Sequence, residues 1–387
     1  NITLADSTAI LKVIGNVTVA GAVTSGTINT TTAVSTFSGA IGTAVLKTKI
    51  DADIGTVFNA AVNASTILIA DAKVVDFDST VTADSITLGS SNAGGTFSAT
   101  STAAQVVTAN LVSFGTDKKG IIISNNAHAS GVTLAGEVGT DALSIALLTA
   151  TQNTTTNGSL YAEAITVANA HGLTVKGDVE VGAGDLILSG TTGDLTLAGT
   201  TAQTITGTGA GALISGGGAG EGRIIVSNAA GATLDIIAGS GSSLNLVSLS
   251  TSGTGHVILN KVGHKINEIA LATGTTLELA KTVTNGQTVI TTAAAAQDEA
   301  SVHADSVVIM PVNLTASQTI ILFDGIKTTD AAANTAAAVA DVESAVRDNA
   351  IFDYVATNAA TDNITITATA KSDTTTASEL SVTTSQA

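Results

Sequence analysis

Two pairs of aspartates are the side chains of this sequence whose types and spacing best suit metal binding. Asp51 and Asp53 are separated by one residue, as are Asp76 and Asp78. In an extended strand, residues two apart project from the same face, so each pair would present two carboxylates together while Phe77 points the other way. Ca²⁺ prefers oxygen ligands, so the pattern suits a calcium site. We favour a solvated acidic face as its explanation and keep calcium as the alternative.

Other catalytic or cofactor-binding chemistry has no support in the residue pattern. The five histidines show no metal-ligand spacing such as HExxH, and we interpret them as solvated turn residues. Ser and Thr are too abundant to single out a nucleophile, and no GxSxG motif is present. With no Trp and two Tyr, the chain lacks an aromatic platform for stacking sugars. We therefore predict no catalytic residues and no enzyme, with a phage tailspike-like polysaccharide-degrading enzyme as a remote alternative.

The composition excludes several further classes of protein. The 387 residues carry 14 Lys+Arg against 31 Asp+Glu, and the resulting net charge of -17 repels nucleic acid. The absence of Cys excludes disulfide-stapled and zinc-finger domains. No run of 18 apolar residues is present, so we expect no transmembrane helix.

The elements that carry these side chains read as short β-strands. Segments such as Ile86–Leu88, Val132–Leu134 and Leu195–Leu197 place an outward Thr between two apolar residues, which is the period-2 pattern of a half-buried strand. One Pro in 387 residues fits strands that are hydrogen-bonded on both edges, where every backbone N–H is needed. The chain is therefore predicted to be all-β.

A repeat of about 20 residues specifies the architecture. The first five phenylalanines are spaced by 21, 19, 20 and 17 residues, and Leu continues the phase twenty residues after the last of them. Such a period is typical of one coil of a β-solenoid, or parallel β-helix, in which equivalent side chains stack into a ladder. The alternative is unrelated hairpins with similar spacing by chance. The predicted core ladder consists of Phe37, Phe58, Phe77, Phe97, Phe114 and Leu134.

The texture of the chain changes near residue 290. We predict a β-solenoid over residues 1–290 and a small C-terminal α+β capping or docking segment over residues 291–387. An Ala-rich stretch with apolar residues at helical spacing predicts one short helix at about residues 330–349. Because an uncovered solenoid end is an aggregation hazard, a terminal segment that covers or presents that edge is expected.

Two segments near the C-terminus carry a resemblance to a known group of proteins. The stretches SQTIILFDG (residues 317–325) and DNAIFDYVATNAATDNITITATAK (residues 348–371), with Gly/Thr/Asn-rich coils before them, resemble the passenger regions of bacterial autotransporters, especially the large surface proteins of alphaproteobacteria. The resemblance implies a β-solenoid exposed outside a Gram-negative cell. No membrane β-barrel sequence follows, and no Met or signal peptide precedes Asn1, so we interpret the chain as processed and mature. The alternative is a secreted surface-layer or fibre protein that never had a barrel.

The expected function is structural. Unpaired backbone groups at the ends of a solenoid allow end-to-end strand addition, so we predict that the chain's partner is another copy of itself, in a cell-surface filament or surface layer (S-layer). The segments expected to donate strands contain Ile2 and Leu4 at the front and Leu380 and Val382 at the back. An autotransporter-type adhesin that binds a host or neighbouring cell surface is the alternative.

Overall fold

The computed structural model describes most of the first 270 residues and selected strands beyond them. From residue 267 on, it describes the path and pairing of these strands. The described residues are 1–4, 6, 8–44, 47–89, 93–113, 118–208, 211–239, 246–252, 255–261, 264, 266–270, 276–279, 289–290, 308–309, 318–321, 327–330, 352–357, 363–368 and 378–385.

The chain is an all-β parallel solenoid, as the sequence predicts. It makes about 11 turns of about 22 residues, slightly longer than the predicted coil of about 20. Two compact units are distinguished, residues 1–187 with 208–211, and residues 188–207 with 212–387. In both units the inward residues alternate with outward ones along the strands, because a strand's side chains point to opposite faces in turn.

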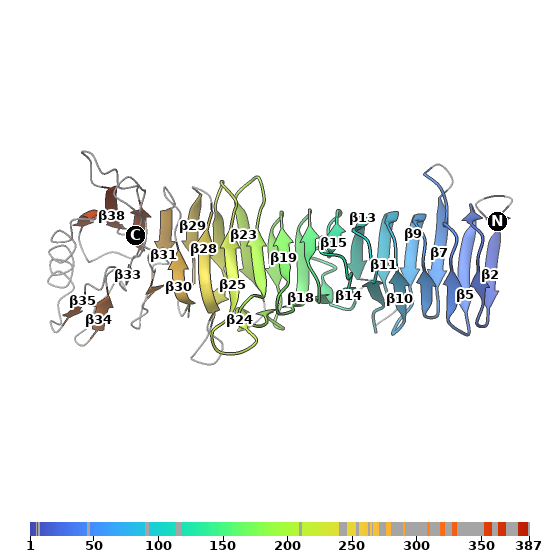
Figure 1. Cartoon of the computed structure of the whole chain (residues 1–387), viewed down its shortest axis with the longest axis horizontal. Coiled ribbons are helices and arrows are strands. Elements are labelled where there is room, and N and C mark those ends of the chain that lie inside the picture. The colour runs from blue at the N-terminus through green and yellow to red at the C-terminus, as the bar shows by residue number, and fades with distance from the viewer. Residues whose placement is uncertain are drawn as a thin grey trace. The chain divides into compact units, whose positions relative to one another are not determined.

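The first unit contains two long runs of parallel strands, whose coils lie side by side from blue to green in Figure 1. One run comprises β2 (Ile10–Ile14), β5 (Thr27–Thr31), β7 (Thr48–Ala52), β9 (Val62–Ile69), β11 (Val81–Leu88), β13 (Gln105–Ser113), β15 (Val132–Leu134), β17 (Thr154–Thr156) and β19 (Gly172–Val175). The other comprises β3 (Thr18–Val19), β6 (Ser35–Phe37), β8 (Thr56–Phe58), β10 (Val74–Phe77), β12 (Thr96–Ala99), β14 (Ile121–Ser124), β16 (Ile145–Ala150), β18 (Leu160–Val167) and β20 (Val179–Val181). The remaining strands are β1 (Ile2–Thr3), β4 (Val23–Thr24) and β21 (Leu186–Leu188).

The second unit is also built of parallel strands, which form three runs. The first run is β22 (Asp194–Leu197), β25 (Glu221–Val226), β28 (Leu246–Thr251) and β30 (Ile266–Ala270). The second is β23 (Gln203–Gly207), β26 (Ala232–Asp235), β29 (His256–Leu259) and β31 (Thr276–Leu279), and the third is β24 (Leu213–Gly216) and β27 (Ile237–Ala238).

Antiparallel pairing appears only after β31 among the strands that the structure describes. These later strands are β32 (Val289–Ile290), β33 (Val308–Ile309), β34 (Gln318–Ile321), β35 (Lys327–Asp330), β36 (Phe352–Thr357), β37 (Asn363–Ala368) and β38 (Ser378–Ser385). The change of pairing falls near the predicted boundary at residue 290. The predicted helix over residues 330–349 lies outside the described residues, apart from Asp330, which ends β35.

Four phenylalanines form one stacked column in the core of the first unit. The ring centroids of Phe37 and Phe58 lie 5.1 Å apart, those of Phe58 and Phe77 5.2 Å, and those of Phe77 and Phe97 4.8 Å, with interplanar angles of 14° to 19°. All four side chains are fully buried. The register pairs Phe77 with Ala99, so Phe97 reaches the column from a position two residues earlier in its strand.

The predicted ladder is wrong at Leu134. This residue is buried, but it lies in β15 and pairs with Val107 and Thr156, which belong to the other run of strands. The phase of 20 residues could not reveal this, because one coil crosses more than one side of the solenoid. The column of Phe97 continues instead through Ile122 of β14. Phe114 lies outside the described residues.

Buried amides bridge successive coils at equivalent corners of the two units. In the first unit, Asn126 donates to the backbone C=O of Ala103 at 2.8 Å and contacts Gln105, whose own amide donates to the C=O of Phe77 at 2.8 Å. In the second, Asn228 donates to the side-chain oxygen of Gln203 at 3.1 Å. Because an unpaired buried amide is costly, these bonds fix the position of each coil on its neighbour.

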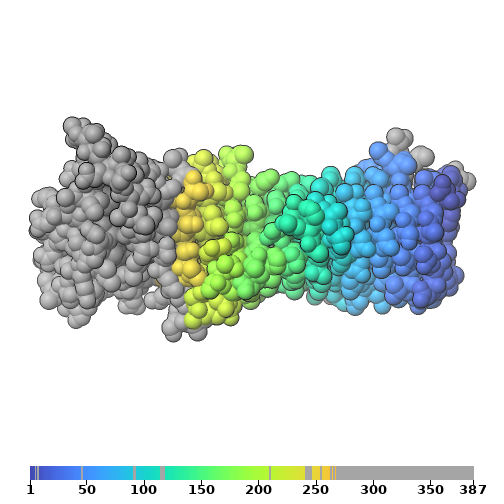
Figure 2. Space-filling model, viewed as in Figure 1, coloured from blue at the N-terminus to red at the C-terminus, as the bar shows by residue number. Residues whose placement is uncertain are grey.

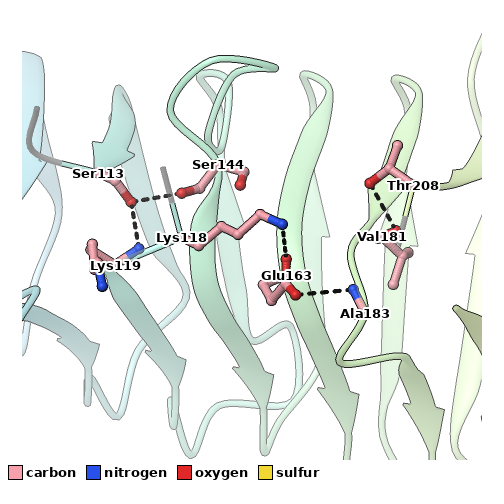
Figure 3. Close-up of polar contacts among 8 residues, drawn as sticks. All are labelled: Ser113, Lys118, Lys119, Ser144, Glu163, Val181, Ala183 and Thr208. Carbon is pink, nitrogen blue, oxygen red and sulfur yellow. Dashed lines mark hydrogen bonds and ion pairs between the residues drawn. The ribbon is translucent and has the colours of Figure 1, made fainter. Parts of the chain in front are cut away.

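A chain of polar contacts links further coils of the first unit (Figure 3). The Ser113 hydroxyl donates to the backbone C=O of Ser144 at 2.7 Å. The Lys118 ammonium lies 2.8 Å from Glu163, whose other oxygen accepts the N–H of Ala183 at 3.0 Å. The Lys118 side chain is 49% exposed, so the ion pair contributes at most about 1 kcal/mol. These contacts connect neighbouring coils through their side chains.

Truncation of the column tests its contribution to stability. We expect Phe58→Ala to lower the free energy of unfolding by about 3–5 kcal/mol, since it leaves a cavity between two stacked rings. The matched control is Val57→Ala, because Val57 is the outward, half-buried neighbour in the same strand. Urea denaturation followed by circular dichroism measures both, and equal losses in the two variants would contradict a special role for the rings.

Candidate assembly edge

The first coil of the first unit has one hydrogen-bonded neighbour on each of its sides. Its strands β1, β2 and β3 pair with β4, β5 and β6 of the next coil, and no other pairing of these three strands occurs within the described part of the chain. Figure 1 shows β2 as the outermost labelled strand of the blue coils. Within the described residues, the outer edge of this coil is therefore open.

The backbone groups of three of the five β2 residues point to this open edge. The N–H of Thr27 in β5 donates to the C=O of Ala9 at 2.8 Å. In a parallel pair, alternate residues of a strand direct their N–H and C=O groups to the same neighbour. The groups of Ile10, Lys12 and Ile14 therefore point away from β5, where a further strand can bond to them.

The side chains of β2 divide into an inward and an outward set. Val13 is 5% exposed, whereas Ile10 is 64% and Ile14 60% exposed. Lys12 lies between the two isoleucines and is also exposed. The outward face of the edge strand is thus apolar, charged and apolar in turn.

Exposed apolar side chains concentrate near this edge. Six large apolar residues of the described chain are exposed, and four of them belong to the first two coils, which form the blue end in Figure 2. A strand edge with unpaired backbone and exposed isoleucines is a surface that proteins normally cover. The four are Ile10, Ile14, Val17 and Val34.

A local turn holds the start of β2. The Asp6 carboxylate accepts hydrogen bonds from the backbone N–H of Thr8 at 2.7 Å, from its hydroxyl at 2.6 Å, and from the N–H of Ala9 at 3.1 Å. The hydrogen bond from the Thr8 side chain is the largest of the effects that lower the pKa of Asp6. The aspartate therefore stays ionised, and keeps the turn, to lower pH than in an unfolded chain.

The predicted front donor segment is used within its own chain. Ile2 donates its N–H to the C=O of Ala22 at 2.7 Å, and Leu4 donates to Thr24 at 3.2 Å. These bonds occupy one edge of β1, as those to β5 occupy one edge of β2, so within the described residues both strands share the outer edge of the first coil. The sequence analysis overlooked β2, although the run from Ile10 to Ile14 has the alternation that marks a strand.

The predicted back donor segment also has partners on both edges. Leu380 and Val382 lie in β38, which pairs in parallel with β36 and in antiparallel with β37. β38 is therefore an interior strand and offers no free edge. The outer member of this group is β36, which pairs with β38 and with no other strand of the described residues.

The four candidate calcium ligands lie in two different runs of strands. Asp51 is in β7, and Asp53 follows it and accepts a hydrogen bond from the Asn29 amide at 3.3 Å. Asp76 is in β10, and Asp78 follows it and accepts a hydrogen bond from the Thr100 hydroxyl. The structure does not bring the two pairs together. Among the residues searched, no group of three or more His, Cys, Asp or Glu side chains is placed to hold a metal ion.

One histidine departs from the interpretation of solvated turn residues. His264 is 5% exposed, and its Nδ1 accepts the N–H of Ala238 at 3.0 Å. Burial, opposed by a backbone hydrogen bond with Lys261, lowers the pKa of His264 to about 4. The other described histidines are His128 and His171, which are half-buried, and His256, which is exposed.

Calcium binding is tested by thermal unfolding. We expect millimolar CaCl₂ to leave the Tm unchanged, because one aspartate of each pair accepts a hydrogen bond from a neighbouring coil and the two pairs lie in different runs of strands. Differential scanning calorimetry with CaCl₂ or with EDTA measures this, and Asp53→Asn with Asp78→Asn is the control. A rise in Tm that the substituted chain lacks would establish a calcium site there.

His264 predicts a pH-dependent loss of stability. Its folded pKa of about 4 lies below the ordinary 6.5, so only the unfolded state takes up this proton between these values. The contribution to stability is complete above pH 6.5 and is lost as the pH falls towards 4, by roughly 3 kcal/mol. Urea titrations at several pH values should show a shallower dependence of the unfolding free energy on pH for His264→Asn than for the parent. An equal dependence in the two chains would contradict a contribution from His264.

Comparisons with known proteins add no assignment to this geometry. No family model, no curated protein and no solved structure matches the chain. Within the part of the chain that was searched, no helix is both long and apolar enough to cross a membrane.

Proposed function

We propose that this chain is a non-enzymatic structural protein of the bacterial exterior that assembles with copies of itself into a filament or surface layer by end-to-end strand addition. The observation that carries this proposal is the open edge of β2, with its outward backbone groups and the exposed Ile10 and Ile14. A continuing coil would satisfy both features at once.

The energies expected at this edge favour a reversible contact. Burying the exposed parts of two isoleucines contributes about 2–4 kcal/mol, and each added backbone hydrogen bond about 0.5–1.5 kcal/mol. Association costs an estimated 4–15 kcal/mol of translational and rotational freedom. Strand β2 alone therefore supports weak association, and we expect assembly to depend on concentration and to strengthen where many copies are held on one surface.

The exterior location rests on the resemblance to autotransporter passengers and on the strand-rich, cysteine-free composition. A receptor-binding site would normally include exposed aromatic or arginine anchors. Arg223 instead forms a bidentate pair with Asp194, at 2.6 and 2.7 Å, in the adjacent strand. This engagement favours the structural role over the adhesin.

The proposal is tested by placing charge on the open edge. We expect Ile10→Lys with Ile14→Lys to abolish assembly while leaving the fold intact, because both side chains are outward. Sedimentation velocity over a concentration series and negative-stain electron microscopy measure assembly of the 387-residue chain. Circular dichroism reports the fold.

The matched control is Val74→Lys with Val106→Lys, since these valines are 45% and 41% exposed but lie away from the first coil. This control should assemble like the parent. Dispersed single particles of the parent at all concentrations would overturn the proposed function and favour the adhesin. Loss of assembly in the control as well as in the edge variant would overturn the role of β2.

A further inference from the structure

We propose that strand β36 (Phe352–Thr357) of one copy adds to β2 of the next in parallel, with Asp353 opposite Lys12. This inference rests on the proposed function and identifies the strand that occupies the open edge. It replaces the segment of Leu380 and Val382, which β36 and β37 already flank.

The pairing of the C-terminal strands makes β36 the outer strand of its group. β31 is followed in space by β37, β37 by β38, and β38 by β36. Each of the first three has its next edge occupied, whereas among the strands that the structure describes β36 pairs on one edge. An outer strand with a free edge is a donor that need not leave its own sheet.

The direction of β36 suits continuation of a parallel sheet. β37 runs antiparallel to β31, and β38 runs antiparallel to β37, so the direction of β31 is restored in β38. β36 is parallel to β38 and therefore runs in the same sense as the coil strands of the second unit. Two reversals thus return the outermost strand to the direction that a parallel solenoid uses throughout.

The sequence of β36 complements that of β2 in charge and in pattern. Lys12 is flanked two residues away on both sides by the exposed isoleucines of β2. Asp353 is followed two residues later in β36 by Val355. With Asp353 opposite Lys12, an acidic residue meets a basic one, and Val355 comes opposite Ile14. The chain carries 14 Lys+Arg against 31 Asp+Glu, so basic partners for an acidic residue are few, which adds selectivity to this match.

Charge reversal tests the register. We expect Lys12→Asp and Asp353→Lys each to raise the concentration needed for half-assembly about three- to tenfold, because each places like charges opposite one another. The double variant should return to within about twofold of the parent. Sedimentation velocity measures all four chains, and Lys49→Asp is the matched control for a charge change in a neighbouring coil strand.

The outcomes separate this inference from the proposed function. If the single variants assemble like the parent while Ile10→Lys with Ile14→Lys remains monomeric, β2 is the assembly edge but β36 is not its occupant. If neither single variant is rescued by the double variant, the register is wrong. A monomeric parent removes the proposed function and this inference together.

Cross-linking provides a second readout that does not depend on charge. The chain has no Cys, so Lys12→Cys and Asp353→Cys each introduce a single thiol. Mixed and oxidised under assembling conditions, the two variants should form a disulfide-linked heterodimer, because directly opposite strand positions lie within reach of a disulfide. Mixing Lys12→Cys with Asp76→Cys should not do so. Equal yields from the two mixtures would overturn the proposed pairing.

Discussion

The parallel register between one coil and the next is the constraint on which the rest of the structure depends. Each strand in the interior of a unit completes its backbone hydrogen bonds only through the coils on both sides of it. Side chains that share a register position must therefore stack directly, as Phe37 does on Phe58. A coil cannot adjust its register alone, since a slip of one residue would exchange its inward and outward faces.

Buried polar groups reinforce this constraint. Aromatic and aliphatic columns favour burial but tolerate small shifts along a strand, as the displaced position of Phe97 shows. Hydrogen bonds are directional, and the amides of Asn126 and Asn228 each reach a particular carbonyl or amide of the preceding coil. The apolar core therefore supplies most of the stabilisation, and the polar corners select the register.

The fold class could be predicted from the sequence because each coil of a solenoid needs the same kinds of residue at equivalent positions. Recurrent Phe residues and alternating Thr residues indicated both the repeat and the strands. The sides of each coil could not be assigned in the same way. Leu134 shares the phase of the phenylalanines but lies in another run, because loops of unequal length separate the sides. The equivalent corners at Asn126 and Asn228 carried a signal that was overlooked, since each Asn is followed by Ala and, after a few more residues, by a Gly-x-Thr-Leu segment.

The existence of an open strand edge could be predicted from the sequence, but the segment that forms it could not. A solenoid must end, so open strand edges follow from the fold class. Which edges remain open depends on which strands find partners inside the chain, and β1 and β2 each bond to the second coil on one edge. The sequence alone contains no measure of that competition. The exposed fractions of Ile10 and Ile14 in the structure are needed to identify them as uncovered. Their alternation with Val13 in the sequence is the same whether or not a further strand covers them.

Unequal coil lengths have a consequence for how such a protein can change over time. Asp194 and Arg223 are direct neighbours in space although 29 residues separate them, whereas other coils need fewer residues to close. Additional residues form a longer loop at a corner of the coil, and the strand after the loop keeps the same register with the preceding coil. Insertions and deletions at these corners are therefore tolerated mechanically, and the loops can diversify in length and chemistry while the scaffold beneath them is retained.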